Sequence, residues 1–108
     1  MITKPAVAKY TINIDTDVQG NSYQAVSGPC ELVAVLASAA GGAVAIRIFD
    51  TATGSSAQVN RRLMIAANTG ESTPFTPCQP MQFNHGIFVV FEQGGTPFGG
   101  EVCLVVTK

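Results

Sequence analysis

The sequence has little charge, one histidine and no tryptophan, and these shortages exclude several classes of function. Asp, Glu, Lys and Arg make up 12% of the residues, whereas a typical soluble domain has about 25%. The net charge of −1 does not supply the clustered basic surface that nucleic acid binding requires, and the adjacent Arg61 and Arg62 are interpreted as a solvated strand start. One imidazole cannot build a metal centre that needs several of them. We therefore expect no nucleic acid partner, no metal and no cofactor.

The three cysteines, Cys30, Cys78 and Cys103, fit neither a zinc site nor a disulfide framework. Their number is odd and their spacing is long, so we interpret them as small buried hydrophobic side chains in a reducing cytoplasm. A contact between Cys30 and Cys103 on neighbouring strands is the alternative. The first fifteen residues hold no apolar segment of signal-peptide length, so nothing there indicates secretion.

The apolar stretch between Glu31 and Arg47 is shorter than the roughly 17 to 25 residues of a membrane-spanning helix. No membrane partner is therefore expected. The central Gly41-Gly42 pair argues against any helix here, and apolar alternation on both sides of it predicts a β-hairpin. Both faces of this hairpin are apolar, which predicts a position near the centre of a sheet, covered on both sides. One face of its first strand is expected to carry Cys30, Leu32, Ala34 and Leu36.

Glycine and proline divide the whole chain into short alternating segments. No window predicts a convincing amphipathic helix. Residues 1–108 are therefore expected to form one all-β domain, a single β-sandwich or jelly-roll-like barrel of about eight short antiparallel strands, with a flexible N-terminal arm over residues 1–6. The strands are predicted, free of glycine and proline, at residues 7–14, 23–26, 30–38, 43–50, 61–67, 81–83, 87–92 and 101–107.

Two connections and the arm supply candidates for contact with a partner. Pro74, Pro77 and Pro80 recur at intervals of three, and their missing backbone donors exclude a central strand, so this segment should follow an edge or the surface. Phe98 lies between two glycine pairs, where its ring either anchors a partner or folds back over the end of the barrel. The full set of contact candidates is Met1, Ile2, Thr3, Lys4, Pro5, Ala6, Pro74, Phe75, Pro77, Pro80 and Phe98.

No pattern of catalytic residues is present in the sequence. His85 stands in Asn84-His85-Gly86, which is typical of a turn. Asp15 and Asp17 resemble part of a calcium loop but lack its distant glutamate, so a solvated turn is favoured. Neither a phosphate-binding glycine motif nor a nucleophile elbow occurs. We expect that the protein is not an enzyme.

The composition also bears on assembly. Hydrophobic residues make up 46% of the chain, and a small domain has too much surface to hide such a content entirely in its interior. Part of the outside is therefore expected to be covered by another copy or another protein. The alternative is that the many alanines and glycines raise the apolar content without creating adhesive patches.

The segment between Ser27 and Val106 contains a particular order of strand and turn features. Gly28-Pro29 enters an apolar strand, a small-residue segment follows, Phe49-Asp50 ends a strand before a Thr/Ala/Gly/Ser loop, and a turn precedes a "GIFVV" strand. This pattern resembles small virion proteins of tailed bacteriophages, although the prolines of residues 74–80 depart from the plainer hairpin of that pattern. The resemblance implies a β-sandwich or jelly-roll subunit that works as a homo-oligomer, often a trimer, and it transfers no functional residue.

The resemblance leads to a first hypothesis of a capsid decoration or cement protein that bridges major capsid subunits. Such a protein would be made in the host cytoplasm and would reside in the virion. A neck, tail or fibre component is an alternative. A carbohydrate- or receptor-binding module ranks lower, because sugar sites favour exposed aromatic side chains and the chain has no Trp and only Tyr10 and Tyr23.

Overall fold

The computed structural model describes residues 9–15, 22–39, 44–67, 72–93 and 100–107. Within these ranges no α-helix occurs, and no helix is long and apolar enough to cross a membrane. A 3-10 turn, η1 (Gln58–Asn60), precedes the fifth strand. The strands are β1 (Lys9–Asp15), β2 (Ser22–Ser27), β3 (Cys30–Ala39), β4 (Val44–Asp50), β5 (Arg61–Ala67), β6 (Ser72–Phe75), β7 (Met81–Phe83), β8 (Gly86–Gln93) and β9 (Gly100–Thr107).

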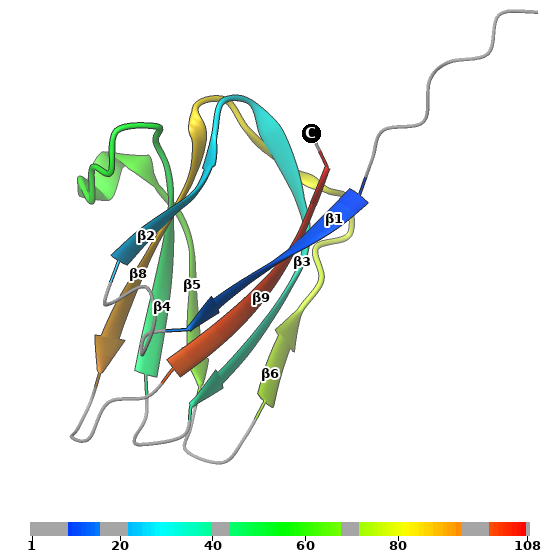
Figure 1. Cartoon of the computed structure of the whole chain (residues 1–108), viewed down its shortest axis with the longest axis vertical. Coiled ribbons are helices and arrows are strands. Elements are labelled where there is room, and N and C mark those ends of the chain that lie inside the picture. The colour runs from blue at the N-terminus through cyan, green and yellow to red at the C-terminus, as the bar shows by residue number, and fades with distance from the viewer. Residues whose placement is uncertain (1–8, 16–21, 40–43, 68–71, 94–99, 108) are drawn as a thin grey trace, which may run out of the picture.

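The strands form two antiparallel sheets that pack face to face (Figure 1). Sheet A has the order β1-β9-β3-β6, with β7 also beside β3, and sheet B has the order β2-β8-β4-β5. The pairings are nested, since β1 pairs with β9, β2 with β8, β3 with β6, and β4 with β5. This order is that of a double-sheet jelly roll. The predicted all-β class is confirmed, with nine strands described instead of eight.

The predicted hairpin between β3 and β4 is wrong. β3 lies in sheet A between β9 and β6, whereas β4 lies in sheet B between β8 and β5. Both strands are interior members of their sheets, but the chain passes from one sheet to the other between Ala39 and Val44. Alternating apolar residues are compatible both with a hairpin in one sheet and with two strands in different sheets. The extended pairing of β3 with β9, from Glu31 to Ala39, favours the second arrangement.

A β-bulge in β3 reverses the facing of its second half. The pairing with β9 shifts between Leu32 and Ala34, so Val33 is an extra residue and the alternation changes phase. Leu32 and Val35 are buried, whereas Leu36 is 46% exposed. The prediction that Leu36 shares a face with Leu32 is therefore wrong, as is the prediction that this strand is covered on both sides.

The hydrophobic core fills the space between the two sheets. In β9, every second side chain from Val102 to Val106 is buried, because side chains alternate between the faces of a strand. The largest fully buried side chains are Phe83, Ile14, Leu32, Ile46, Ile48, Ile87, Leu104, Val89, Val102 and Val106.

The proline-rich segment contains a strand that was not predicted. β6 pairs with β3 at the edge of sheet A, and Pro74 lies opposite Leu36. An edge strand tolerates the missing backbone donor of a proline, so the predicted edge position is confirmed even though the strand itself was missed. β7 pairs with β3 further along, and thus β6 and β7 form one interrupted edge. Gly86 and Gly100 begin strands too, although the prediction placed every glycine outside them.

No disulfide joins the three cysteines, all of which are among the described residues, and only Cys30 is fully buried. Cys103 is half-buried and Cys78 is exposed. The interpretation of all three as buried hydrophobic side chains is therefore wrong for Cys78. Cys103 lies opposite Leu36, whereas Cys30 lies opposite Phe83 at the start of β3, so the alternative contact between Cys30 and Cys103 is not formed.

Candidate interaction surfaces

The predicted contact residues fall on different parts of the chain. Residues 1–6 and Phe98 lie outside the described residues. Pro74 and Pro80 are exposed, and Phe75 and Pro77 are half-buried. Phe75 packs against the hydrophobic core, so its ring helps to hold the β6 edge on sheet A.

The outer face of sheet A is uncharged across its middle. The strand registers place Asn13, Cys103, Leu36 and Pro74 in one row across β1, β9, β3 and β6. The next row across the first three of these strands consists of Thr11, Val105 and Ala34. None of these seven side chains carries a charge, and the strongly exposed Leu36 stands among them.

Charged side chains lie at both ends of this face. Asp15 lies opposite Glu101 at one end, and Lys9 and Glu31 both lie opposite Thr107 at the other. A shallow cavity of about 220 Å³ lies toward the Glu101 end, beside Leu36. The face thus has an apolar centre and a polar rim.

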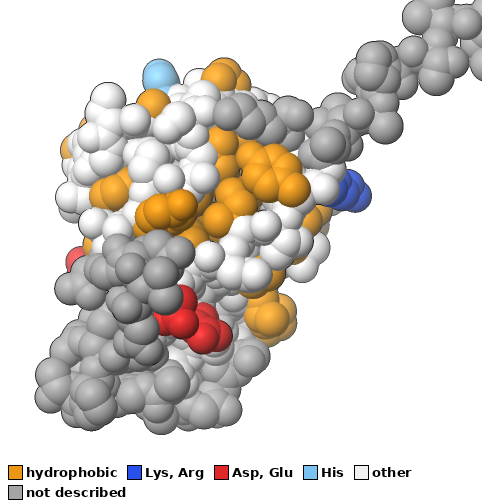
Figure 2. Space-filling model, in the orientation of Figure 1, with side chains coloured by type: hydrophobic (Ala, Val, Ile, Leu, Met, Phe, Trp, Pro, Cys, Tyr) orange, Lys and Arg blue, Asp and Glu red, His pale blue; other side chains and the backbone are white. Residues whose placement is uncertain are grey.

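Hydrophobic side chains are also exposed on the side where the edge strands β1 and β2 lie in front (Figures 1 and 2). Tyr10 on β1 is 38% exposed and Tyr23 on β2 is 37% exposed. Ile12 and Ala25 on the same strands are only partly buried against the core. This side of the sandwich therefore presents apolar surface next to the edges of both sheets.

The turn between β7 and β8 is organised by Asp50, the last residue of β4. One carboxylate oxygen, Oδ2, accepts a hydrogen bond from the backbone N–H of Asn84 at 3.1 Å. The other, Oδ1, accepts from those of His85 at 2.8 Å and Gly86 at 3.3 Å. Burial acts to raise the pKa of Asp50, but the three backbone hydrogen bonds and the nearby His85 together lower this pKa below its ordinary value of 3.8. His85 lies in a turn, as its neighbours indicated.

Arg62 joins the edges of the two sheets beside this turn. Its guanidinium donates a hydrogen bond to the backbone carbonyl of Gln82 on β7 at 2.7 Å. It also lies over the Phe83 ring, 5.3 Å from its centroid, and 4.0 Å from Asp50 Oδ2. Arg62 is therefore a link between β5 of sheet B and β7 of sheet A.

The segment between β4 and β5 is held over the outer face of sheet B by Gln24. The side-chain Nε2 of Gln24 donates to the carbonyl of Thr51 at 2.7 Å, and its Oε1 accepts from the N–H of Gly54 at 3.0 Å. Beneath this segment, the outward-facing Phe49 and Phe88 are only 3% and 8% exposed, with ring centroids 6.3 Å apart. These contacts hold residues 51–58, called the wall below, above the outer face of the sheet.

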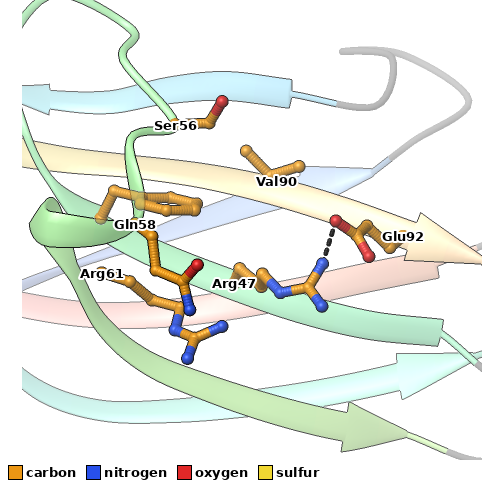
Figure 3. A pocket seen from close by; sticks show the side chains of 7 residues that line it. Arg47, Ser56, Gln58, Arg61, Val90 and Glu92 are labelled. Carbon is orange, nitrogen blue, oxygen red and sulfur yellow. Dashed lines mark ion pairs between the residues drawn. The ribbon is translucent and has the colours of Figure 1, made fainter.

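This wall and the sheet enclose a pocket of about 330 Å³ (Figure 3). Arg47 and Glu92 form an ion pair on its floor. Arg61 forms no side-chain hydrogen bond or ion pair with any described residue, and Figure 3 shows the Arg47 guanidinium turned toward Glu92, on the side away from Arg61. The lining consists of Arg47 and Phe49 from β4, Val90 and Glu92 from β8, Ser56 and Gln58 from the wall, and Arg61 at the start of β5.

Sequence reasoning did not find this pocket. Arg61 was interpreted as a solvated strand start, and Arg47 and Glu92 are far apart in the chain. The alternation of side chains in β4 places Arg47 on the outer surface of the sheet, but only the pairing of β4 with β8 puts it near Glu92.

The described part of the chain holds no cluster of three or more His, Cys, Asp or Glu that could bind a metal ion. Of the two residues that resemble part of a calcium loop, Asp15 ends β1, and Asp17 lies outside the described residues.

The nested strand order makes this chain a double-sheet jelly-roll protein. No protein-family model matches the chain, and a comparison with curated proteins found no match. Among solved structures, it aligns with a chain of the virus-like particle of the extra small virus of the giant freshwater prawn Macrobrachium rosenbergii, determined by cryo-electron microscopy. The alignment covers 99% of this chain and 82% of that chain, with 14% identity and a TM-score of 0.37. This weak similarity to a viral particle carries no argument about function.

Proposed function

We propose that this protein is a non-enzymatic virion structural protein, a capsid decoration or cement protein that bridges major capsid subunits and associates with its own copies, a trimer being the favoured form. The observation that carries the proposal is the outer face of sheet A, with its exposed Leu36 and its charges confined to the two ends. Jelly rolls serve as viral capsid domains among other roles, and the sequence between Ser27 and Val106 resembles small phage virion proteins.

The outer face of sheet A has the anatomy of a protein interface. Interface centres are depleted in charge and surrounded by a polar rim, and here Leu36 and its uncharged neighbours lie between Asp15 and Glu101 at one end and Lys9 and Glu31 at the other. Covering this centre removes apolar surface from water without burying an unpaired charge. A partner on this face therefore gains free energy at little desolvation cost.

The work of such a protein is mechanical. Contacts spread over neighbouring shell subunits oppose their separation, and a homo-oligomer that engages several of them at once gains affinity from multivalency. A neck, tail or fibre position would use the same face. Binding to isolated shells, as opposed to tails, distinguishes these positions.

The proposal is tested by replacing Leu36 with lysine. We expect the wild-type protein to form a stable oligomer in light scattering across a dilution series and to bind shells that lack it. Leu36→Lys places a charge at the centre of the face that meets the shell, so it should weaken shell binding by at least about thirtyfold, the effect of losing an interface residue worth about 2 kcal/mol.

Met64→Lys is the matched control, because Met64 is 52% exposed on the outer face of sheet B. This variant should associate like the wild type, and both variants should unfold at the wild-type midpoint. A wild-type monomer at every concentration would refute self-association. Shell binding by Leu36→Lys equal to that of the wild type would refute the assignment of this face.

A further inference from the structure

Two arginines line the pocket on the outer face of sheet B. They are Arg47 and Arg61, two of the three arginines of the chain, in a protein whose net charge is −1. The ion pair with Glu92 neutralises one guanidinium, so the pocket keeps one uncompensated positive charge. A ligand with a single negative charge matches this balance.

The geometry of the arginines favours a carboxylate ligand. A guanidinium presents planar pairs of N–H donors that match the two oxygens of a carboxylate. Arg61 has no side-chain partner among the described residues, and Arg47 has further N–H donors besides those facing Glu92. Arg47 is held in place by its ion pair and is only 26% exposed. A carboxylate in this pocket can therefore accept hydrogen bonds from the unpaired Arg61, while the fixed Arg47 adds positive charge and further donors on the floor.

The remaining lining favours hydroxyl groups on the same ligand. The carboxylate of Glu92 accepts hydrogen bonds from hydroxyls but repels an anion of higher charge such as phosphate. Ser56 and Gln58 each offer both a donor and an acceptor at the opposite wall, and Val90 supplies an apolar patch on the floor. The volume of about 330 Å³ lies at the lower end of the range of small-molecule sites, about 300 to 1,000 Å³, and suits one sugar ring.

We infer that this pocket binds a hydroxylated carboxylate the size of one sugar ring, such as a hexuronic acid residue of a glycan. This activity goes beyond the proposed structural role and does not depend on it, because the pocket and the Leu36 face lie on opposite sheets. The Leu36→Lys variant should accordingly bind the sugar acid like the wild type, so failure of one proposal leaves the other standing.

The test is a titration of the isotope-labelled protein followed by NMR, with the side-chain N–H signals of Arg47 and Arg61 as reporters. The probes are glucuronate, glucose, acetate, inorganic phosphate and a doubly capped aspartate. Glucuronate should bind at least about fivefold more tightly than each of the others, because it alone combines one negative charge with ring hydroxyls. A charge-assisted hydrogen bond contributes enough that Arg61→Gln should weaken glucuronate binding by at least about tenfold.

Arg62→Gln is the matched control, since it removes the same charge from the next residue of β5, which contacts Gln82 and Phe83 outside the pocket. It should leave glucuronate binding within about twofold of the wild type. Glu92→Gln should reduce the preference for glucuronate over acetate, because the acceptor for hydroxyls is weakened and the repulsion of simple anions is removed.

Several results would overturn the inference. Equal losses in Arg61→Gln and Arg62→Gln would show a general charge effect. Acetate or phosphate binding as tightly as glucuronate would show an unselective anion site, and capped aspartate doing so would assign the pocket to a protein carboxylate. Unchanged arginine signals with every probe would show that the pocket binds none of these ligands.

Discussion

Replacing Asp50 with asparagine tests whether a charged acceptor holds the turn between β7 and β8. The carboxylate accepts backbone hydrogen bonds from three successive residues at 3.1, 2.8 and 3.3 Å, and its side chain is only 12% exposed. Asparagine keeps the shape but turns one oxygen into an NH₂ donor that faces backbone N–H groups. A hydrogen bond to a charged group contributes about 1.5 to 3 kcal/mol. Because the exposed Asn84 and His85 can bond to water instead, we expect a loss of about 2 kcal/mol in the free energy of unfolding.

The predicted loss depends on pH. The pKa of Asp50 is lowered in the folded protein from its ordinary value of 3.8, so the unfolded chain takes up a proton at higher pH than the folded one. The stabilisation by the carboxylate is therefore complete above the unfolded pKa and disappears as the pH falls through the folded pKa. Asparagine does not titrate, so the difference between the two proteins should shrink in acid.

The assay is urea unfolding of both proteins at about pH 7 and about pH 2.5, supported by thermal melts. At neutral pH, Asp50→Asn should lower the melting temperature by roughly 8 to 16 °C, since about 1 kcal/mol corresponds to about 4 to 8 °C for a domain of this size. Glu101→Gln, at an exposed carboxylate, should change stability by less than about 0.5 kcal/mol. Equal losses for Asp50→Asn at both pH values would refute the electrostatic reasoning and leave side-chain packing as the cause.

Two further predictions concern a glycine and the N-terminal arm. Gly86→Ala should cost more than about 3 kcal/mol or prevent folding, because the added Cβ would lie 2.4 Å from the carbonyl oxygen of Val26, at a φ of +150°. Gly54→Ala, where the nearest atom lies at 3.7 Å and φ is +70°, should cost only about 1 to 2 kcal/mol, and comparable losses in the two thermal melts would contradict the steric argument. Deleting residues 1–6 should leave the unfolding midpoint unchanged while lowering occupancy on shells, and unchanged occupancy would remove the arm from the proposed function.

Alternation of side chains was sufficient to predict most of the strands. In β9, Val102, Leu104 and Val106 are buried, as period-two alternation indicated, because the two faces of a strand are defined by adjacent residues alone. The edge position of Pro74 was predictable for a similar reason, since a missing backbone donor is a property of the residue itself. The class of fold followed from such local features.

The candidate sites were less predictable than the fold. Leu36 was assigned to the wrong face, because one extra residue in the pairing of β3 with β9 changes the phase of everything that follows. Arg61 is an exposed strand start, as the sequence indicated, but its place beside a pocket was not predictable, because the pocket depends on the segment that Gln24 holds over sheet B. In each case the deciding contact joins residues far apart in the chain.

Local chemistry thus establishes an all-β chain with short strands, few charges and turn-forming breaks. Tertiary structure alone decides which strands become neighbours. The apolar residues that end β3 at Ala39 and begin β4 at Val44 are compatible with a hairpin within one sheet and with a crossing between two sheets. That choice depends on the total free energy of pairing β3 with β9 and β4 with β8, which no single segment contains. The uncharged outer face of sheet A and the arginine pocket of sheet B both follow from it.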